Sequence, residues 1–484
     1  MPSVYEAHFR CAEYYLEVLH KTELLYLQGS EELQRGLFLF DLDWQNIRTS
    51  QSWVAANMET NQTLAELCDD YPRAGALILA LRQHPKDQIR WETAALIAAQ
   101  QLQRRKSEAA RLGNLGLAYA DLGMFQQAIE LQQKASAIDR EINNRLGEAE
   151  DIGNLGNVYT NLGKYHKAIE FQEEHLRVTR EFGDRRGESN ALGNLGNAYF
   201  GLNETRKALE FHEQHLHIAR EIGDLLGESI ALGNLGLAYA SLGEYHKAIV
   251  HYEQHLQIAQ EIGDRRGESQ VLGNLGNVYS ELGELHKAVE YHEKQLQLTR
   301  LVGNRQGEGQ ALTNLGNNYL VLGEPNLAIQ YYRQALYVDR DIGDQAGEEV
   351  DLINLGYLSE NLDEQELAIQ FYEQALTIDR KLGDKRSEGS ALGRLGVVYG
   401  HLGRYQTAIE FLEQALVIAH ETRDQASEGA GLFHLSIILD LLNERTQAIG
   451  YAETALNIFR ELHDPRMQDI SKQLDEWHTR TNQK

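Results

Sequence analysis

The chain has 484 residues, with 46 Lys and Arg against 72 Asp and Glu, which gives a formal net charge of −26 at pH 7. So acidic a chain disfavours nucleic acids and anionic membranes as partners, because both are bound through clustered Lys and Arg. The 2 cysteines exclude a disulfide scaffold, and no apolar run or basic leader marks a membrane span or a secretory signal, so we expect a cytoplasmic protein.

The first segment in the chain, residues 1–70, follows no clear repeat period. Its stretches AEYYLEVLHKTELLYL and WQNIRTSQSWVAANM carry apolar residues at the spacing of amphipathic helices. We therefore predict a helical N-terminal segment over 1–70.

The second segment, residues 71–110, is similar to the repeats that follow it. Pro85 falls on the same repeat position as Pro325, and Ala95 falls on the same position as Ala335. These matches predict a degenerate repeat in the register of the later ones.

The third segment is a tandem array with a period of 40 residues. The tetrapeptide GNLG and its variants TNLG, INLG, GRLG and FHLS begin at Gly113, Gly153, Gly193, Gly233, Gly273, Thr313, Ile353, Gly393 and Phe433. Nine blocks of 40 residues thus fill 111–470 without insertion. Such a period indicates stacked supersecondary units that bury their apolar faces against each other.

Turn residues divide each block into two helices. Counting from the first residue of a block, position 13 is Gly, Asn or Asp, which tolerate a left-handed backbone and end helices. Position 34 is Asp or Asn, which favours a helix N-cap. Pro325 lies where a second helix would begin. We predict an all-α solenoid of antiparallel helix pairs, closed by a polar capping helix over 465–484.

The repeats resemble tetratricopeptide repeats. The pattern is carried in the first block by Leu115, Gly116, Tyr119, Gly123 and Ala128. The 40-residue form with GNLGNAY and RRGES is similar to Pins/LGN-type G-protein signalling adaptors and to kinesin light chains, and the N-terminal segment looks like the helical linker of bacterial STAND-type signalling ATPases. The resemblance implies a right-handed superhelix that binds other proteins and is not an enzyme.

The first helix of each block leaves one face open. Positions 2, 5, 9 and 12 form its apolar stripe, and glycines at positions 3 and 6 would let a neighbouring helix come close. Positions 4 and 7 lie roughly opposite the stripe. They hold no Lys or Glu in any block, although these residues are better helix formers than the Asn found there.

Amide side chains both donate and accept hydrogen bonds, so a row of them can match the backbone of an extended peptide. In the families that this chain resembles, the corresponding asparagines line the concave groove and hold the partner's backbone. The residues predicted to bind peptide are Asn154, Asn157, Asn194, Asn197, Asn234, Asn274, Asn277, Asn314, Asn317, Asn354 and Arg394. The C-terminal blocks lose the amides and should recognise something different, an apolar or acidic side chain. Alternatively, the amides bond to neighbouring helices and only set the stacking.

The histidines suggest a weaker alternative. His251 and His255 have the spacing of a metal-ligand pair, and His212-Glu213-Gln214-His215 is one residue short of a zinc signature. His175, His215 and His255 replace small residues of other blocks, so we expect them to pack between helices, and we predict neither a metal nor a cofactor.

Two other functional classes stay open. The chain could be the sensor or regulatory arm of a STAND-type signalling or defence system that acts with a separate NTPase or effector. It could also be an architectural array that associates with itself. The preferred interpretation is a cytoplasmic protein–protein interaction scaffold that binds an extended peptide segment of a partner along the Asn-lined groove.

Overall fold

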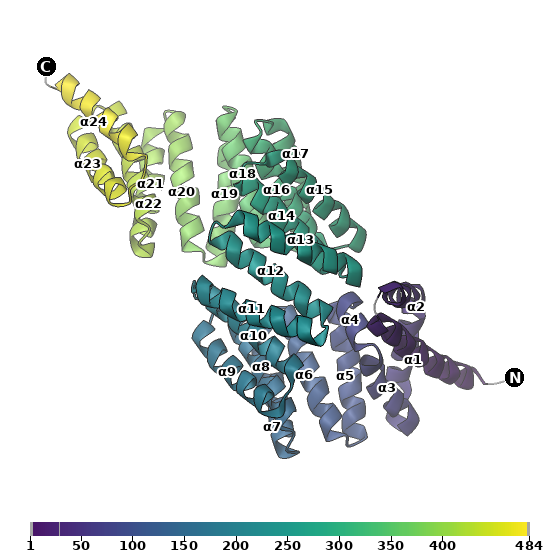
Figure 1. Ribbon diagram of the computed structural model, residues 1–484. Helices are drawn as coiled ribbons and strands as arrows, with labels where there is room; N and C mark the ends of the chain where they lie inside the picture. The colour runs from purple at the N-terminus through teal and green to yellow at the C-terminus, as the bar shows by residue number, and fades with distance from the viewer. Residues whose placement is uncertain (1–2, 29, 482–484) are drawn as a thin grey trace. The chain divides into compact units, whose positions relative to one another are not determined.

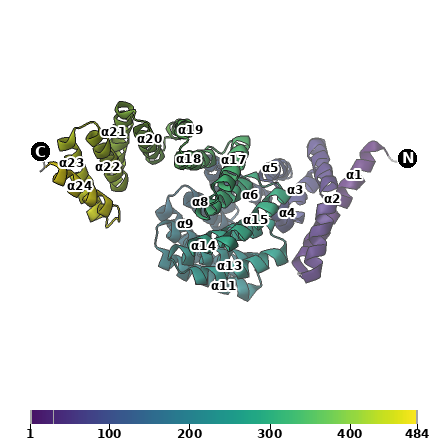
Figure 2. The same cartoon turned by 90° about the horizontal axis from the view of Figure 1, so that it is seen from above.

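The computed structural model describes residues 3–28 and 30–481. They form two compact units, Met1–Leu282 and Gly283–Lys484, and each is described by itself. Every regular element in the described ranges is helical. In both units the helices follow one another as neighbouring antiparallel pairs (Figures 1 and 2). The prediction of an all-α solenoid of helix pairs is confirmed.

Unit 1 combines the N-terminal helices with the first repeats. Its helices are α1 (Val4–Gln28), α2 (Ser30–Asn57), the short 3-10 helix η1 (Met58–Thr60), α3 (Gln62–Ala74), α4 (Ala76–Arg82), α5 (Pro85–Gln101), α6 (Arg105–Asp121), α7 (Phe125–Glu141), α8 (Arg145–Asn161), α9 (Tyr165–Phe182), α10 (Arg185–Gly201), α11 (Thr205–Ile222), α12 (Leu225–Ser241), α13 (Tyr245–Ile262) and α14 (Arg265–Glu281).

Unit 2 continues the pairs to the C-terminal region. Its helices are α15 (Leu285–Val302), α16 (Arg305–Val321), α17 (Pro325–Ile342), α18 (Gln345–Asn361), α19 (Gln365–Leu382), α20 (Lys385–His401), α21 (Tyr405–Thr422), α22 (Gln425–Leu441), α23 (Arg445–Glu461) and α24 (Met467–Thr481). Helix α24 buries Ile470, Leu474 and Trp477 in one apolar cluster with α22 and α23, and so covers the apolar face of the last pair.

The helix ends occur at the residues that the repeat positions predict. Position 13 is left-handed in each block, with φ of +73° at Gly123 and 61° at Asn203. At position 34, the Asp184 side chain accepts a hydrogen bond from the Gly187 amide at 3.0 Å. A second left-handed residue precedes this cap, such as Gly183 with φ of +69°. Sequence reasoning had not singled out that position.

Glycines at position 6 let the two helices of a pair touch. A side chain at position 22 of the second helix lies against each of them, and an added Cβ would be 2.6 Å from Gln172 at Gly156 and 2.5 Å from Tyr332 at Gly316. At such distances the touching side chain or the helix itself must shift to admit a larger residue. These contacts confirm that the glycines allow close helix packing.

The N-terminal helices pack against the C-terminal end of helix α13 in the same unit. Ile262, at the end of α13, lies in the same apolar cluster as residues of α1 to α5. Gln34 of α2 donates a hydrogen bond to the Glu261 carbonyl at 2.9 Å, and Arg82 donates one to the Gly263 carbonyl at 3.0 Å. Helix α2 thus contacts a repeat more than 200 residues further along the chain (Figure 1).

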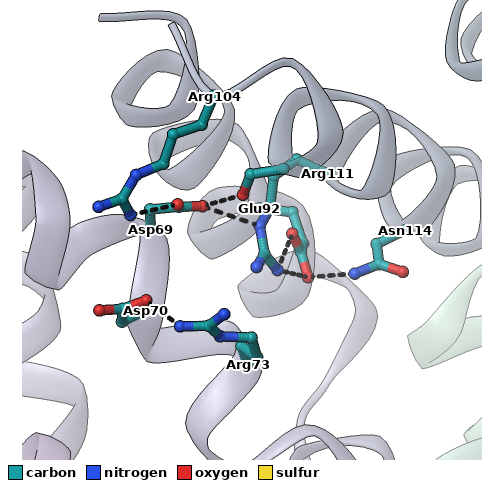
Figure 3. Close-up of polar contacts among 8 residues, drawn as sticks. Asp69, Asp70, Arg73, Glu92, Arg104, Arg111 and Asn114 are labelled. Atoms are coloured by element: carbon teal, nitrogen blue, oxygen red, sulfur yellow. Dashed lines mark hydrogen bonds and ion pairs between the residues drawn. The ribbon is translucent and has the colours of Figure 1, made fainter. Parts of the chain in front are cut away.

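A buried polar network joins the N-terminal helices to the first repeat (Figure 3). Arg111 of α6 lies 3.2 Å from Glu92 of α5 and 3.4 Å from Asp69 of α3, and each side chain is less than 10% exposed. Asp69 also accepts from Arg104 at 3.0 Å, and Glu92 accepts from Asn114 at 2.9 Å. Each buried charge therefore has a partner of opposite sign.

Removing the central cation should destabilise unit 1. Arg111→Ala leaves the Asp69 and Glu92 carboxylates buried without it, a change that costs about 3–5 kcal/mol in comparable networks. Urea unfolding should show this loss. Arg177→Ala, which breaks the exposed Arg177–Glu174 pair, serves as the control and should cost far less. Equal losses in the two variants would contradict a network that depends on burial.

Two carboxyl groups are buried at position 1. Burial, together with the nearby Asp139 carboxylate, raises the pKa of Asp151 to about 8. Burial also raises the pKa of Asp351 to about 8, although a hydrogen bond from Thr313 opposes the shift. Since both pKa values lie above the ordinary 3.8, folding is favoured where these groups are protonated, and that stability is lost as the pH rises from about 4 to about 8.

The double variant Asp151→Asn/Asp351→Asn should therefore flatten the dependence of stability on pH. An amide keeps the shape and the hydrogen-bonding oxygen but cannot ionise. We expect its melting temperature to exceed that of the wild type near pH 8 and to match it near pH 4. The exposed Asp475→Asn should change neither value, and a double variant that melts lower than the wild type near pH 8 would contradict the assignment.

Candidate peptide-binding site

The position-4 amides lie on the accessible side of the first helices. Asn154, Asn194, Asn234 and Asn274 of unit 1 are half-buried, with their Cα atoms on α8, α10, α12 and α14. The apolar stripe on the other side of these helices is buried, as Leu192 shows. The side chains are therefore held by the helices but reachable from outside.

A hollow of about 610 Å³ follows this row in unit 1. We call it the amide trough. Its walls come from the first helices α6, α8, α10 and α12. The amides that line it are Asn114, Asn154, Asn157, Asn190, Asn194, Asn197 and Asn234. Five of the predicted residues, Asn154, Asn157, Asn194, Asn197 and Asn234, thus share one cavity, whereas Asn274 and Asn277 lie outside its lining.

Most of these amides have no hydrogen-bond partner in the part of the chain that the structure describes. Among the described residues of unit 1, no hydrogen bond reaches the side chains of Asn154, Asn194, Asn197, Asn234, Asn274 or Asn277. Asn157 is different, because its oxygen accepts from Gln172 at 2.9 Å. Asn114 is also different, because it donates to Glu92. Stacking therefore uses two of the amides and leaves the others available.

Histidines form part of the trough's floor. His175 and His215 lie against Gly153 and Gly193 and are 5% and 4% exposed. Burial lowers the pKa of each to about 4, so both rings are neutral at pH 7. Neither nitrogen of His175 has a hydrogen-bond partner among the described residues. The expectation that these histidines pack between helices is confirmed.

Charged side chains also line the trough. Asp184, Asp224 and Glu150 line it together with Arg186, which lies 3.9 Å from Asp224. Sequence reasoning had not assigned these residues or Asn190 to the site. The caps Asp184 and Asp224 could have been assigned to the site from the sequence. Position 34 directly precedes the first helix of the next block, so it lies at the N-terminal end of that helix.

The predicted residues of unit 2 lie on α16, α18 and α20. Asn314 and Asn354 are half-buried and make no hydrogen bond to another described residue, whereas Asn317 accepts from the Tyr332 hydroxyl at 2.6 Å. Arg394 lies on α20, with its guanidinium 5.6 Å from the centre of the Tyr357 ring. Within unit 2, position 4 thus changes from amides on α16 and α18 to a cation on α20.

Neither a metal centre nor a membrane span emerges from the part of the chain that is described. Residues 3–28 and 30–481 contain no group of three His, Cys, Asp or Glu placed to hold a metal ion. His212 lies against Gly196 and not beside a ligand set. In the same ranges no helix is both long and apolar enough to cross a bilayer.

Comparison with solved structures shows proteins with a similar fold. A STAND protein with a tetratricopeptide repeat sensor from Pyrococcus horikoshii is 16% identical, with a TM-score of 0.58, and the match covers 96% of this chain and 74% of that one. A Rap protein complexed with Competence and Sporulation Factor is 16% identical, with a TM-score of 0.52 over 78% of this chain and 99% of that one. The apo quorum sensor NprR from B. thuringiensis is 17% identical, with a TM-score of 0.50 over 72% and 97%.

Comparison by sequence identifies the family. No curated protein matches the chain. Models described as Tetratricopeptide repeat match residues 109–142, 150–221, 227–300, 307–381 and 387–461, which is well over half of the chain. The matched ranges follow the helix pairs described above. The chain therefore belongs to the tetratricopeptide repeat family.

Proposed function

We propose that this protein is a non-enzymatic scaffold that binds an extended peptide segment of a partner protein along the amide trough. The observation that carries the proposal is the row of half-buried amides that border one cavity and make no hydrogen bond to another described residue. Polar groups in such a place are normally hydrogen-bonded, and a peptide backbone supplies both donors and acceptors.

The spacing of the row suits an extended chain. Packed helices lie about 8–10 Å apart, and each successive first helix presents one position-4 amide. An extended peptide rises about 3.3 Å per residue, so three residues span roughly the same distance. Asn154, Asn194 and Asn234 would then meet about every third residue of the peptide. Each hydrogen bond would contribute about 0.5–1.5 kcal/mol to binding.

The floor and ends of the trough add selectivity to this backbone recognition. Neutral His175 and His215 can each donate or accept one further hydrogen bond. Arg186 and the two cap residues Asp184 and Asp224 place charges of both signs at the rim. A partner segment whose side chains include charged groups that pair with these residues would be complementary to this arrangement.

A quadruple variant separates binding from stacking. Asn194→Ala/Asn197→Ala/Asn234→Ala/Asn274→Ala removes four amides that have no protein partner. Because Ala is a better helix former than Asn, we expect an equal or higher melting temperature. A random-peptide display library selected on the wild type should yield ligands whose affinity, measured by fluorescence anisotropy, falls at least tenfold in this variant.

The control changes four exposed side chains on the second helices, Glu213, His217, Glu253 and Gln257, to Ala. It should bind the selected peptides like the wild type. Two results would contradict the proposal. One is a wild type that selects no peptide in preference to the quadruple variant. The other is a quadruple variant whose melting temperature collapses, which would show that the amides set the stacking.

A second candidate function is the regulatory arm of a STAND-type system. It is favoured by the likeness to the STAND protein, which extends over 96% of the chain and so reaches beyond the repeats into the N-terminal helices. Those helices dock on α13, and binding of a partner would regulate the system by separating the N-terminal helices from α13. Nucleotide hydrolysis by a STAND-type NTPase encoded beside this chain, measured with and without it, separates a regulator from an independent scaffold.

A further inference from the structure

A size rule links position 3 of the first helix to position 25 of the second. In four of the six blocks whose position 3 is Gly, a large residue at position 25 fills the space; an added Cβ at Gly193 would be 2.7 Å from His215. In three of the five blocks whose position 25 is Ala, position 3 is larger. Ile353, for example, packs into the same cluster as Ala375. In each such pair the larger residue fills the space between the two helices, which we call the notch.

The block at 391–430 breaks this rule. Its position 3 is Gly393 and its position 25 is Ala415, and an added Cβ at Gly393 would meet nothing within 4 Å. In the first block, which also pairs Gly with Ala, Asp151 of the next block fills the space at 3.1 Å from such a Cβ. The equivalent residue after the 391–430 block is Gly431, which cannot do so.

The unfilled notch opens into a cavity of about 440 Å³ in unit 2. We call it the Arg394 pocket, and its lining includes Gly393, Arg394, Val397, Leu412, Ala415 and His434. Val397, Leu412 and Ala415 make the inner part apolar. The volume lies within the range of sites that bind small organic molecules.

Arg394 is the charge at the rim that has no counter-ion. It lies over the rings of Tyr357 and Tyr372, at 5.6 and 5.9 Å from their centres. Among the described residues no carboxylate comes within 4.0 Å of its guanidinium. The pocket's other arginine, Arg466, is already paired with Asp464 at 2.8 Å.

Arg394 is hydrogen-bonded to Tyr372, and two further groups at the rim, Glu360 and His434, form no ion pair with it among the described residues. Glu360 accepts a hydrogen bond from the Tyr372 hydroxyl at 3.2 Å, and it lies 3.9 Å from the nearest nitrogen of His401. Burial lowers the pKa of His434 to about 4, so this ring is neutral at pH 7 and can donate or accept a hydrogen bond.

We propose that the Arg394 pocket binds a carboxylate carried on a small apolar stem. The stem enters the notch between Gly393 and Ala415, where it contacts Leu412 and Val397. The carboxylate stays at the rim and pairs with Arg394, whose planar guanidinium suits a carboxylate. This site lies wholly within unit 2, so it stands or falls independently of the amide trough.

The test uses two probes that differ only in charge, 4-phenylbutyrate and its neutral amide 4-phenylbutyramide. Saturation-transfer NMR titrations of the full chain give their affinities. We expect the acid to bind at least tenfold more tightly than the amide, because the amide keeps one acceptor oxygen for Arg394 but loses the negative charge and the second acceptor oxygen. A tripeptide that ends in Phe, as free acid and as amide, tests whether a peptide terminus supplies the same group better.

Two variants locate the binding. Gly393→Ile copies Ile353 of the preceding block, so it should keep the melting temperature and abolish binding of the acid by filling the notch. Arg394→Gln should weaken the acid about ten- to a hundredfold and leave the amide unchanged. Arg333→Gln, an exposed change on α17, removes the same charge elsewhere and should have no effect.

Three outcomes would overturn the proposal. The first is a wild type to which the acid does not bind. The second is a Gly393→Ile protein that folds and still binds the acid. The third is an amide that binds as tightly as the acid, since Arg394 would then play no part in recognition.

Discussion

The structure depends on how side chains of the second helices fill the space beside glycines of the first. Gln172 lies against Gly156, and Tyr332 lies against Gly316, at distances that allow no Cβ between them. Gln172 also donates to the Gly153 carbonyl at 2.7 Å, so the packing contact is hydrogen-bonded as well. Asn157 and Asn317 at position 7 accept hydrogen bonds from these same two side chains, whereas Asn154 and Asn314 at position 4 take no part in the contact.

Both proposed sites follow from this constraint. Because the packing between helices is complete without them, the position-4 amides are left on the open side, where Asn194 and Asn234 border the trough. Where the packing is incomplete, at Gly393 and Ala415, a cavity forms instead. The first site offers neutral hydrogen-bonding groups in a row, and the second offers a single cation beside an apolar notch. The two surfaces therefore recognise different chemistry.

Features with a local cause could be predicted from the sequence. The left-handed Asn203 and the cap Asp184 depend on their own short stretch of chain, so one repeat suffices to identify them. The row of amides also followed from helical spacing. The docking of Gln34 on α13 could not be predicted, because it joins segments 227 residues apart and neither carries a periodic signal. The network around Arg111 was missed for the same reason, since its carboxylates come from α3 and α5.

The central claim is that the position-4 amides of Asn154, Asn194 and Asn234 have no hydrogen-bond partner among the described residues, and side-chain hydrogen exchange tests it most directly. In protein labelled with nitrogen-15 at asparagine, NMR resolves each side-chain amide, and its exchange with water reports whether it is hydrogen-bonded. The account predicts that the amides of Asn154, Asn194 and Asn234 exchange about as fast as free asparagine, while that of Asn114, bonded to buried Glu92, exchanges much more slowly. Slow exchange at all four would contradict it.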